Sequence, residues 1–197
     1  MNGDTSRSYP RKVELGDDAF ELRYMAAGDG AAVAAFADAL PAHDLLFMRR
    51  DITQPKVISA WLGGVADGSI TTLLATRNGR VCGCVALIRD ELSWSPHVGE
   101  MRLVLDPGVR GRGLGRALAD ECFAIALGLG IEKIVAYMTV DQQAAIAVFE
   151  ELGFRPEAML REHVRDRQGI KHDVAILSQD VNRLLARLET FGLPAPG

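Results

Sequence analysis

The chain has 197 residues, of which 48% are hydrophobic and 24% are charged, and its formal net charge is −4. These values predict a globular domain with one sizeable core, and the acidic balance argues against a nucleic-acid-binding protein, whose domain would normally be strongly basic. No run of 18 apolar residues occurs, and residues 1–12 lack the pattern of a secretory signal. We therefore expect a soluble cytoplasmic protein without a membrane partner.

The chain shows no internal repeat and no second domain. We expect one domain over residues 13–191, preceded by a flexible N-terminus at 1–12 and followed by a flexible tail at 192–197. The odd count of three cysteines, with no CxxC pair, does not suggest a disulfide framework. The cysteines are therefore interpreted as small buried hydrophobic residues.

The first half of the chain predicts a strand, two helices and a strand hairpin. Phe20, Leu22 and Tyr24 alternate as in a strand. Two apolar patterns with helical spacing follow, and the second begins at Pro55, a residue suited to a first helical turn. The expected elements are a strand at 20–24, helices at 29–40 and 55–66, and strands at 70–77 and 81–89 joined by the tight turn Asn78-Gly79.

The second half predicts alternating strands and helices. Strand 98–105 places Glu100, Arg102 and Val104 on one face. It is followed by a helix from 114, a strand at 132–139, a helix from about 141 that Gly153 ends, strands at 154–165 and 171–177, and a last helix at 180–190. The predicted order is β-α-α-β-β-β-α-β-α-β-β.

Residues 103–118 combine a strand end, a glycine- and arginine-rich loop and a helix start, which together favour phosphate binding. Backbone N–H groups at a helix start have no internal partners, and the helix dipole adds partial positive charge. Glycines let phosphate oxygens approach the backbone, and Arg110, Arg112 and Arg116 add charge. The loop lacks the Gly-Lys-Ser/Thr of a P-loop, and its GxGxG spacing does not fit the dinucleotide fingerprint.

This loop resembles the pyrophosphate-binding motif of the GNAT superfamily of acyl-CoA-dependent N-acetyltransferases, Arg/Gln-x-x-Gly-x-Gly/Ala. In this chain the motif reads Arg110-Gly111-Arg112-Gly113-Leu114-Gly115. The order of elements is also similar to that of the family over residues 18–178. The resemblance implies a single α/β domain (α+β in some schemes) whose mixed, mostly antiparallel sheet has six to seven strands, flanked by four helices. The helix at 180–190 would be an addition.

A second stretch, DQQAAIAVFEELGF at 141–154, resembles the family's Asn-x-x-Ala-x-x-Leu-Tyr-Glu-x-x-Gly-Phe helix. The matching residues are Ala145, Glu150, Gly153 and Phe154. Gln142 stands where the family often has Asn, and Phe149 stands where it often has Tyr. In many relatives that Tyr is the proposed general acid for the departing thiolate, so this chain departs from the family at a mechanistic position.

The resemblance implies acetyl-CoA as the acyl donor and no metal. The residues expected at the donor are Leu103, Val104, Leu105, Arg110, Gly111, Arg112, Gly113, Leu114, Gly115, Arg116, Gln142 and Phe149. The expected reaction is transfer of an acetyl group to a primary amine of a small polar molecule, an amino acid, or a peptide or protein N-terminus. The alternative is an acyl-CoA-binding sensor without catalysis, because the family's Asn and Tyr are missing. A homodimer is compatible with either function.

Transfer to an amine requires a base, because an amine with a pKa of ~10.4 is almost entirely protonated at pH 7. Glu100 is the candidate base, since the phosphinothricin-acetyltransferase-like branch of the family has a base candidate at the equivalent position. The alternative is that Glu100 forms an ion pair with Arg102 on the strand surface. Tyr137 is the candidate acid in place of the missing tyrosine, and the alternative is a tyrosine packed in the core.

The histidines show no metal-binding spacing with cysteines or carboxylates, so we expect surface or hydrogen-bonded polar residues. They are His43, His97, His163 and His172. The family geometry implies acceptor walls from the connection 41–54 and the hairpin 161–173, whose charges have both signs. Such a lining suits an acceptor with its own carboxylate better than a polycation. The alternative is that these charges form a solvated rim.

Overall fold

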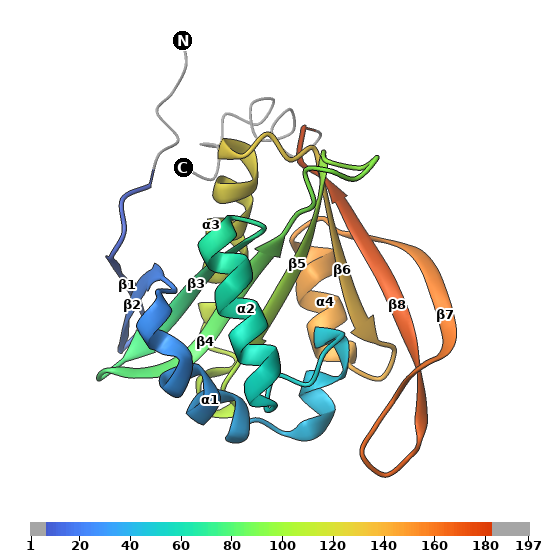
Figure 1. Ribbon diagram of the computed structural model, residues 1–197, viewed down its shortest axis with the longest axis horizontal. Coiled ribbons are helices and arrows are strands. Elements are labelled where there is room, and N and C mark those ends of the chain that lie inside the picture. Colours follow the sequence, from blue (N-terminus) through green and yellow to red (C-terminus); the bar gives the residue numbers. More distant parts are fainter. Residues whose placement is uncertain (1–6, 183–197) are drawn as a thin grey trace.

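The computed structural model describes residues 7–182 (Figure 1). In chain order its elements are β1 (Arg11–Leu15), β2 (Asp18–Tyr24), η1 (Ala27–Asp29), α1 (Gly30–Asp38), η2 (Ala42–Met48), α2 (Pro55–Asp67), β3 (Ile70–Arg77), β4 (Arg80–Ile88), β5 (Val98–Leu105), η3 (Pro107–Val109), α3 (Leu114–Gly128), β6 (Lys133–Thr139), α4 (Gln143–Glu151), β7 (Arg155–Arg165) and β8 (Lys171–Asp180). The η elements are short 3₁₀ helices. None of the helices in the described part of the chain is long and apolar enough to cross a membrane.

The eight strands within residues 7–182 form one sheet, in the order β1-β2-β3-β4-β5-β6-β8-β7. Among these described strands only the β5–β6 pair is parallel, so the mixed, mostly antiparallel sheet is confirmed. The strand count of six to seven is wrong because β1 was missed. This strand pairs with β2 from Arg11↔Leu22 to Leu15↔Asp18. Residues 11 and 12 therefore lie in the sheet and not in a flexible N-terminus. Five residues between Pro10 and Gly16 were too few for a clear strand pattern.

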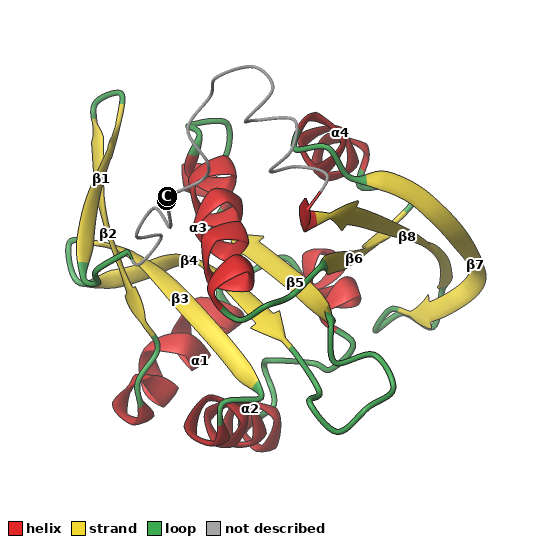
Figure 2. Cartoon of the chain, turned by 90° about the horizontal axis from the view of Figure 1, so that it is seen from above, coloured by secondary structure: helices red, strands yellow, loops and turns green. Residues whose placement is uncertain are grey.

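The helices form a layer on each face of the sheet (Figure 2). Helices α1 and α2 cover one face, and α3 and α4 cover the other. Each layer has its own core, and strand β5 contributes to both, since Val104 packs with the α1–α2 core and Met101 with the α3–α4 core. The four predicted helices are present among residues 7–182. The predicted helix at 180–190 falls mostly outside the described residues, as do the predicted tail and residues 1–6.

The predicted turn residues adopt the backbone geometry that their chemistry favours. Asn78 and Gly79 both have positive φ, 52° and 74°, as a tight hairpin turn requires. Gly153 ends α4 with φ 99°. The three cysteines are free and buried, as predicted for Cys82 and Cys84; the third is Cys122. Burial raises the pKa of the Cys84 thiol to about 12.

Strands β5 and β6 separate soon after they meet. Their pairing covers only Val98 to Glu100 on β5 and Lys133 to Val135 on β6. From Met101 to Leu105, β5 pairs with β4 alone among the strands of residues 7–182. The β6-facing edge of β5 is consequently open along the stretch that leads into the glycine-rich loop.

Candidate active site

Glu100 lies at the point where β5 and β6 part, since Glu100 and Val135 form the last pair between them. Its carboxylate is held by two guanidinium groups. Arg102 Nε donates to Oε1 at 2.7 Å, and Arg49 Nη1 donates to Oε2 at 3.2 Å. The ion pair with Arg102 that was the alternative for Glu100 therefore forms. The catalytic role of Glu100 stays a prediction, because an ion-paired carboxylate can also accept a proton from a bound amine.

Arg49 also links Glu100 to Tyr137. It follows η2 and has a left-handed backbone, with φ 58°. Its guanidinium carbon lies 4.7 Å from the centre of the Tyr137 ring on β6. Tyr137 is half-buried, so its ring contacts this cation at the open side of the strand pair. The two predicted catalytic residues thus share one cation contributed by the 41–54 connection.

A cavity of about 550 Å³ adjoins this group on the α1–α2 face of the sheet. Arg102 lines it, and Ile88, also in its wall, pairs with Glu100 across β4 and β5. Its apolar wall comprises Met48, Ile52, Val57, Ala60, Trp61, Ile70, Ala86, Ile88 and Leu92. Its charged residues are Arg50, Asp67, Arg89, Asp90, Glu91 and Arg102. One predicted wall, the connection 41–54, lines this cavity, but the hairpin 161–173 does not.

The glycine-rich loop has an open backbone that a phosphate group could approach. Gly111 and Gly113 have φ of 71° and 85°, a conformation that side chains rarely adopt. A Cβ built on Gly111 would meet nothing within 4 Å, so the space in front of the loop is open. Gly113 is the N-cap of the 15-residue helix α3 and provides no side-chain cap bond. The first-turn N–H groups of α3 are therefore available to an anion.

Two of the three loop arginines are engaged with carboxylates. Arg110 Nη2 lies 2.6 Å from Asp44 Oδ2 and also donates to the Leu105 carbonyl at 2.9 Å. Arg112 Nη1 lies 2.5 Å from Asp18 Oδ2, and this hydrogen bond is the main cause that lowers the pKa of Asp18. An arriving phosphate would therefore share these cations with protein carboxylates. Arg116 is exposed on the first turn of α3.

Comparison with known proteins agrees with this geometry. The model of the acetyltransferase (GNAT) family matches residues 21–154. The chain belongs to the GNAT acetyltransferase family. The match ends at Phe154, the residue before β7, so the strands β7 and β8 lie beyond the matched segment.

Individual GNAT relatives match different lengths of the chain. A mycothiol acetyltransferase of Beutenbergia cavernae is 39% identical over 57 residues, which are 29% of this chain and 19% of the relative. The chain thus spans about a fifth of that relative's length. An acetyltransferase of the GNAT family from Streptococcus pneumoniae has a TM-score of 0.69 at 23% identity, covering 82% of this chain and 99% of that one. Spermidine N-acetyltransferase from Vibrio cholerae, in complex with CoA and spermine, has a TM-score of 0.70 at 19% identity, covering 84% and 98%.

The remaining residues predicted at the GNAT donor site differ in accessibility. Leu103 and Leu105 are partly buried on the α3 face, beside Gly115, where a Cβ would lie 3.3 Å from Leu105 Cδ1. Val104, Leu114 and Phe149 have their side chains in the core, so only their backbone could contact a ligand. Gln142 is half-buried before α4, and its Oε1 accepts the Thr139 N–H at 3.3 Å.

The structure also assembles a group of residues that sequence spacing did not reveal. His43, Asp141 and His172 come together from η2, the β6–α4 loop and β8. The histidine spacing gave no sign of a metal-binding group, whereas the structure pairs His43 with Asp141 and His172 with Asp166. His43 lies 129 positions from His172, so a local motif could not have indicated their proximity. The only sequence signal was the density of polar residues in the connection 41–54.

Proposed function

We propose that this GNAT protein transfers an acetyl group from acetyl-CoA to the primary amine of a small acceptor that carries its own carboxylate. The observation that carries the proposal is the position of Glu100. It lies where β5 and β6 part, and it is bonded to Arg102, which lines the adjoining cavity. One carboxylate is thus next to both the opening for a donor and the cavity for an acceptor.

Acetyl-CoA would supply an activated acyl thioester, and the chain offers two features that fit it. The loop from Arg110 to Arg116 presents helix N–H groups and open space at Gly111. The β6-facing edge of β5 from Met101 to Leu105 has backbone groups that no described strand pairs. Apart from the Leu105 carbonyl, which already accepts from Arg110, these polar groups would satisfy their hydrogen bonds with the amides of the donor's arm.

Glu100 would take the proton that an incoming ammonium must lose before it can attack. A carboxylate has about four lone-pair sites, and each Glu100 oxygen accepts one bond from an arginine. Acceptor capacity therefore remains for the amine or a bridging water. Tyr137 would donate a proton to the departing thiolate. Its contact with the Arg49 guanidinium fixes the ring at the same opening.

The cavity lining supports an acceptor with an apolar body and charges of both signs. Arg50 and Arg102 could bind a carboxylate, while the apolar wall around Trp61 would receive an aliphatic or aromatic group. Three arginines and three acidic residues line the cavity, so it does not concentrate negative charge. A polycation such as the spermine bound by the Vibrio cholerae relative would find little net attraction here. An amino acid or a peptide N-terminus fits better.

The second candidate function is an acyl-CoA-binding sensor without catalysis. The observation that favours it is the burial of Phe149, which packs 4.9 Å from Phe154 between ring centres and cannot donate a proton. In this case the loop would bind acyl-CoA while Glu100 remained a purely structural ion-pair partner.

Thiol release from acetyl-CoA, measured with a panel of amines, separates the two functions. The panel would contain amino acids, dipeptides, polyamines, aminoglycosides and a lysine-rich protein, with products identified by mass spectrometry. We expect turnover with apolar amino acids or dipeptides. Binding of acetyl-CoA by calorimetry without turnover on any amine would favour the sensor. Acetylation confined to polyamines or aminoglycosides would contradict the carboxylate-bearing acceptor.

The role of Glu100 is tested on the best substrate of that panel. Glu100→Gln should lower turnover by about 10²–10⁴-fold, the usual contribution of general-base catalysis, and should move the pH–rate profile upward. Glu14→Gln is the matched control, because Glu14 is an exposed carboxylate on β1. A loss of less than about threefold in Glu100→Gln at neutral pH would leave Glu100 with a structural role only.

A further inference from the structure

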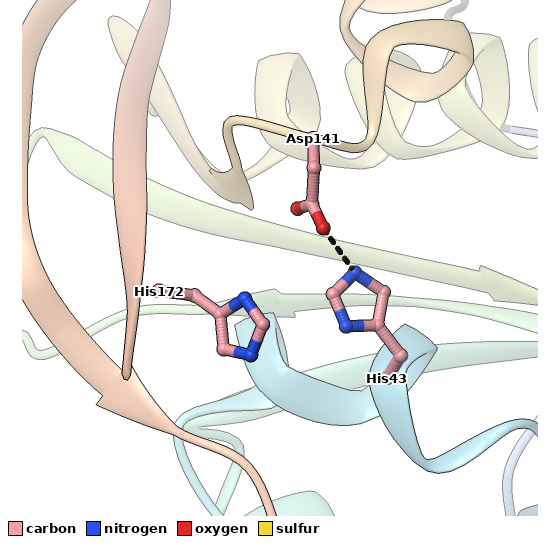
Figure 3. Close-up of side chains that lie close together, drawn as sticks. All are labelled: His43, Asp141 and His172. Carbon is pink, nitrogen blue, oxygen red and sulfur yellow. Dashed lines mark ion pairs between the residues drawn. The ribbon is translucent and has the colours of Figure 1, made fainter. Parts of the chain in front are cut away.

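Three side chains with metal-binding chemistry lie close together, and none of them lines the cavity (Figure 3). His43 comes from η2, Asp141 from the β6–α4 loop and His172 from β8, and one ligand atom of each lies within 4.8 Å of the others. Figure 3 shows Asp141 pointing at His43, with Nε2 of His43 2.9 Å from Oδ2 of Asp141. The two imidazole rings are 5.2 Å apart between centres and inclined at 66°. Two imidazoles and a carboxylate form a ligand set that divalent zinc prefers.

We propose that His43, Asp141 and His172 form a binding site for a divalent metal ion of the zinc class. The proposal departs from the expectation that the chain binds no metal, and it does not depend on the acetyl-transfer reaction. Tetrahedral zinc with ligand bonds of about 2.0–2.2 Å places its ligand atoms roughly 3.4 Å apart. The ligand atoms must therefore move about an ångström closer to one another, which side chains on a loop and a short helix can do by rotation.

The outer contacts of His172 prepare it as a ligand. Its Nε2 donates to Oδ2 of Asp166 at 2.9 Å, which leaves the lone pair of Nδ1 for an ion. Such a carboxylate behind a ligating histidine is a usual feature of metal sites. Asp166 is itself fixed in the β7–β8 turn, because its Oδ1 accepts the N–H groups of Gln168 and Ile170 at 2.9 and 2.8 Å. The hydrogen bond with His172 is the main cause that lowers the pKa of Asp166.

The elements that carry the other two ligands are also fixed. The Val140 N–H donates to the Asp173 carbonyl at 3.1 Å, which ties the loop of Asp141 to β8 next to His172. Asp44, the neighbour of His43 in η2, is held by Arg110. The Asp141 carboxylate already contacts the His43 imidazole, another member of the group. Three protein ligands would leave a fourth position for water or for an anionic group of an acceptor.

The test is metal binding by untagged protein after chelator treatment and dialysis. Titration with Zn²⁺ by calorimetry should give one site per chain, and Co²⁺ should give the visible absorption of a tetrahedral or five-coordinate site. His43→Gln, His172→Gln and Asp141→Asn should each weaken Zn²⁺ binding by at least tenfold. Asp166→Asn should weaken it by about 10–100-fold, as expected for the outer partner of a ligating histidine.

The chain provides matched controls in its two other histidines. His97 and His163 are exposed and lie outside the group, so His97→Gln and His163→Gln should bind Zn²⁺ like the parent protein. Thermal unfolding of each variant without metal establishes that it is folded. Added Zn²⁺ should raise the melting temperature of the parent and of these controls, and not of the His43 or His172 variants. The proposal would be overturned if the parent did not bind Zn²⁺. It would also be overturned if His43→Gln and His172→Gln bound Zn²⁺ as tightly as the parent.

Discussion

Arg167, in the β7–β8 turn, forms an ion pair with Asp51, which lies 116 positions earlier in the segment before α2. Arg167 Nη2 lies 3.1 Å from Oδ2 of Asp51 and 3.3 Å from Oδ1, and it also donates to Thr53 Oγ1 at 2.9 Å. This contact joins the connection that contributes Arg49 to the hairpin that contributes His172. The hairpin is therefore tied to the segment that forms one wall of the cavity, although it does not line the cavity itself.

We predict that Arg167→Gln raises the KM for the acceptor and leaves kcat nearly unchanged. Both side chains are substantially exposed, 57% and 40%, and an exposed pair contributes about 0–1 kcal/mol, so the rise in KM should be at most about fivefold. Steady-state kinetics measures the effect. Arg165→Gln, which changes another exposed arginine at the end of β7, is the control. A large fall in kcat would contradict a positioning role.

Arg49 and Glu100 should act together in catalysis. Arg49→Gln removes the cation that contacts both Glu100 and Tyr137, and we expect kcat to fall by roughly 2–10-fold, as for the loss of a partly exposed cation contact. In a double-mutant cycle with Glu100→Gln the two losses should not add, because the residues are in direct contact. Arg50→Gln is the control at the neighbouring position, and it should change the KM of a carboxylate-bearing acceptor instead. Additive losses would place Arg49 outside the catalytic group.

Gly113→Glu should abolish acetyl-CoA binding, as measured by calorimetry. The substitution places a side chain and a negative charge at the start of α3, where φ is 85° and an anion is expected. Gly79→Glu is the matched control, because Gly79 has a similar φ of 74° in the β3–β4 turn, with open space around it. Both variants bear similar backbone strain, so only a loss of binding confined to Gly113→Glu supports the loop assignment. Unchanged affinity in Gly113→Glu would refute it.

The N-terminal segment should make the folding stability of the protein decrease at alkaline pH. Burial, followed by the hydrogen bond to Glu121 at 2.5 Å, raises the pKa of Tyr9. Glu121 is itself buried and paired with Arg7 and Arg11. The native tyrosine holds its proton more tightly than the tyrosine of the unfolded chain. Its contribution to the free energy of unfolding is therefore complete below about pH 10, the pKa of a free tyrosine, and is lost as the pH rises above that value.

Denaturant unfolding of Tyr9→Phe at a series of pH values tests this linkage. The variant should be less stable than the parent at pH 8, because Glu121 loses a hydrogen-bond donor, and the difference should shrink between about pH 10 and 11. Tyr24→Phe is a useful comparison, since the Tyr24 ring lies 4.8 Å from the Tyr9 ring between centres, while the hydroxyl that donates to Glu121 belongs to Tyr9. A difference that stays constant with pH would show that Tyr9 does not titrate differently in the native state.

The sequence by itself determined the features that depend on local chemistry. Alternation on β5 placed Glu100 and Arg102 on one face, and the Gly111–Gly113 loop showed where a helix begins with exposed N–H groups. These features follow from side-chain period and backbone freedom, which a few neighbouring residues define. Strand β1 was not predicted, because five residues are too few to show a clear alternation. Its strand conformation is defined by its pairing with β2.

Only the tertiary structure decided which distant side chains meet. The placement of β8 between β6 and β7 brings His172 toward Asp141, and the segment after η2 brings the Arg49 guanidinium to Glu100 and Tyr137. The cavity likewise forms from the packing of α2 and the segment before it against β4, and not from the hairpin. Contacts of this kind depend on strand order, register and loop direction together. Because no local run of residues encodes those properties, a single sequence predicted the fold but could not indicate that His43, Asp141 and His172 meet.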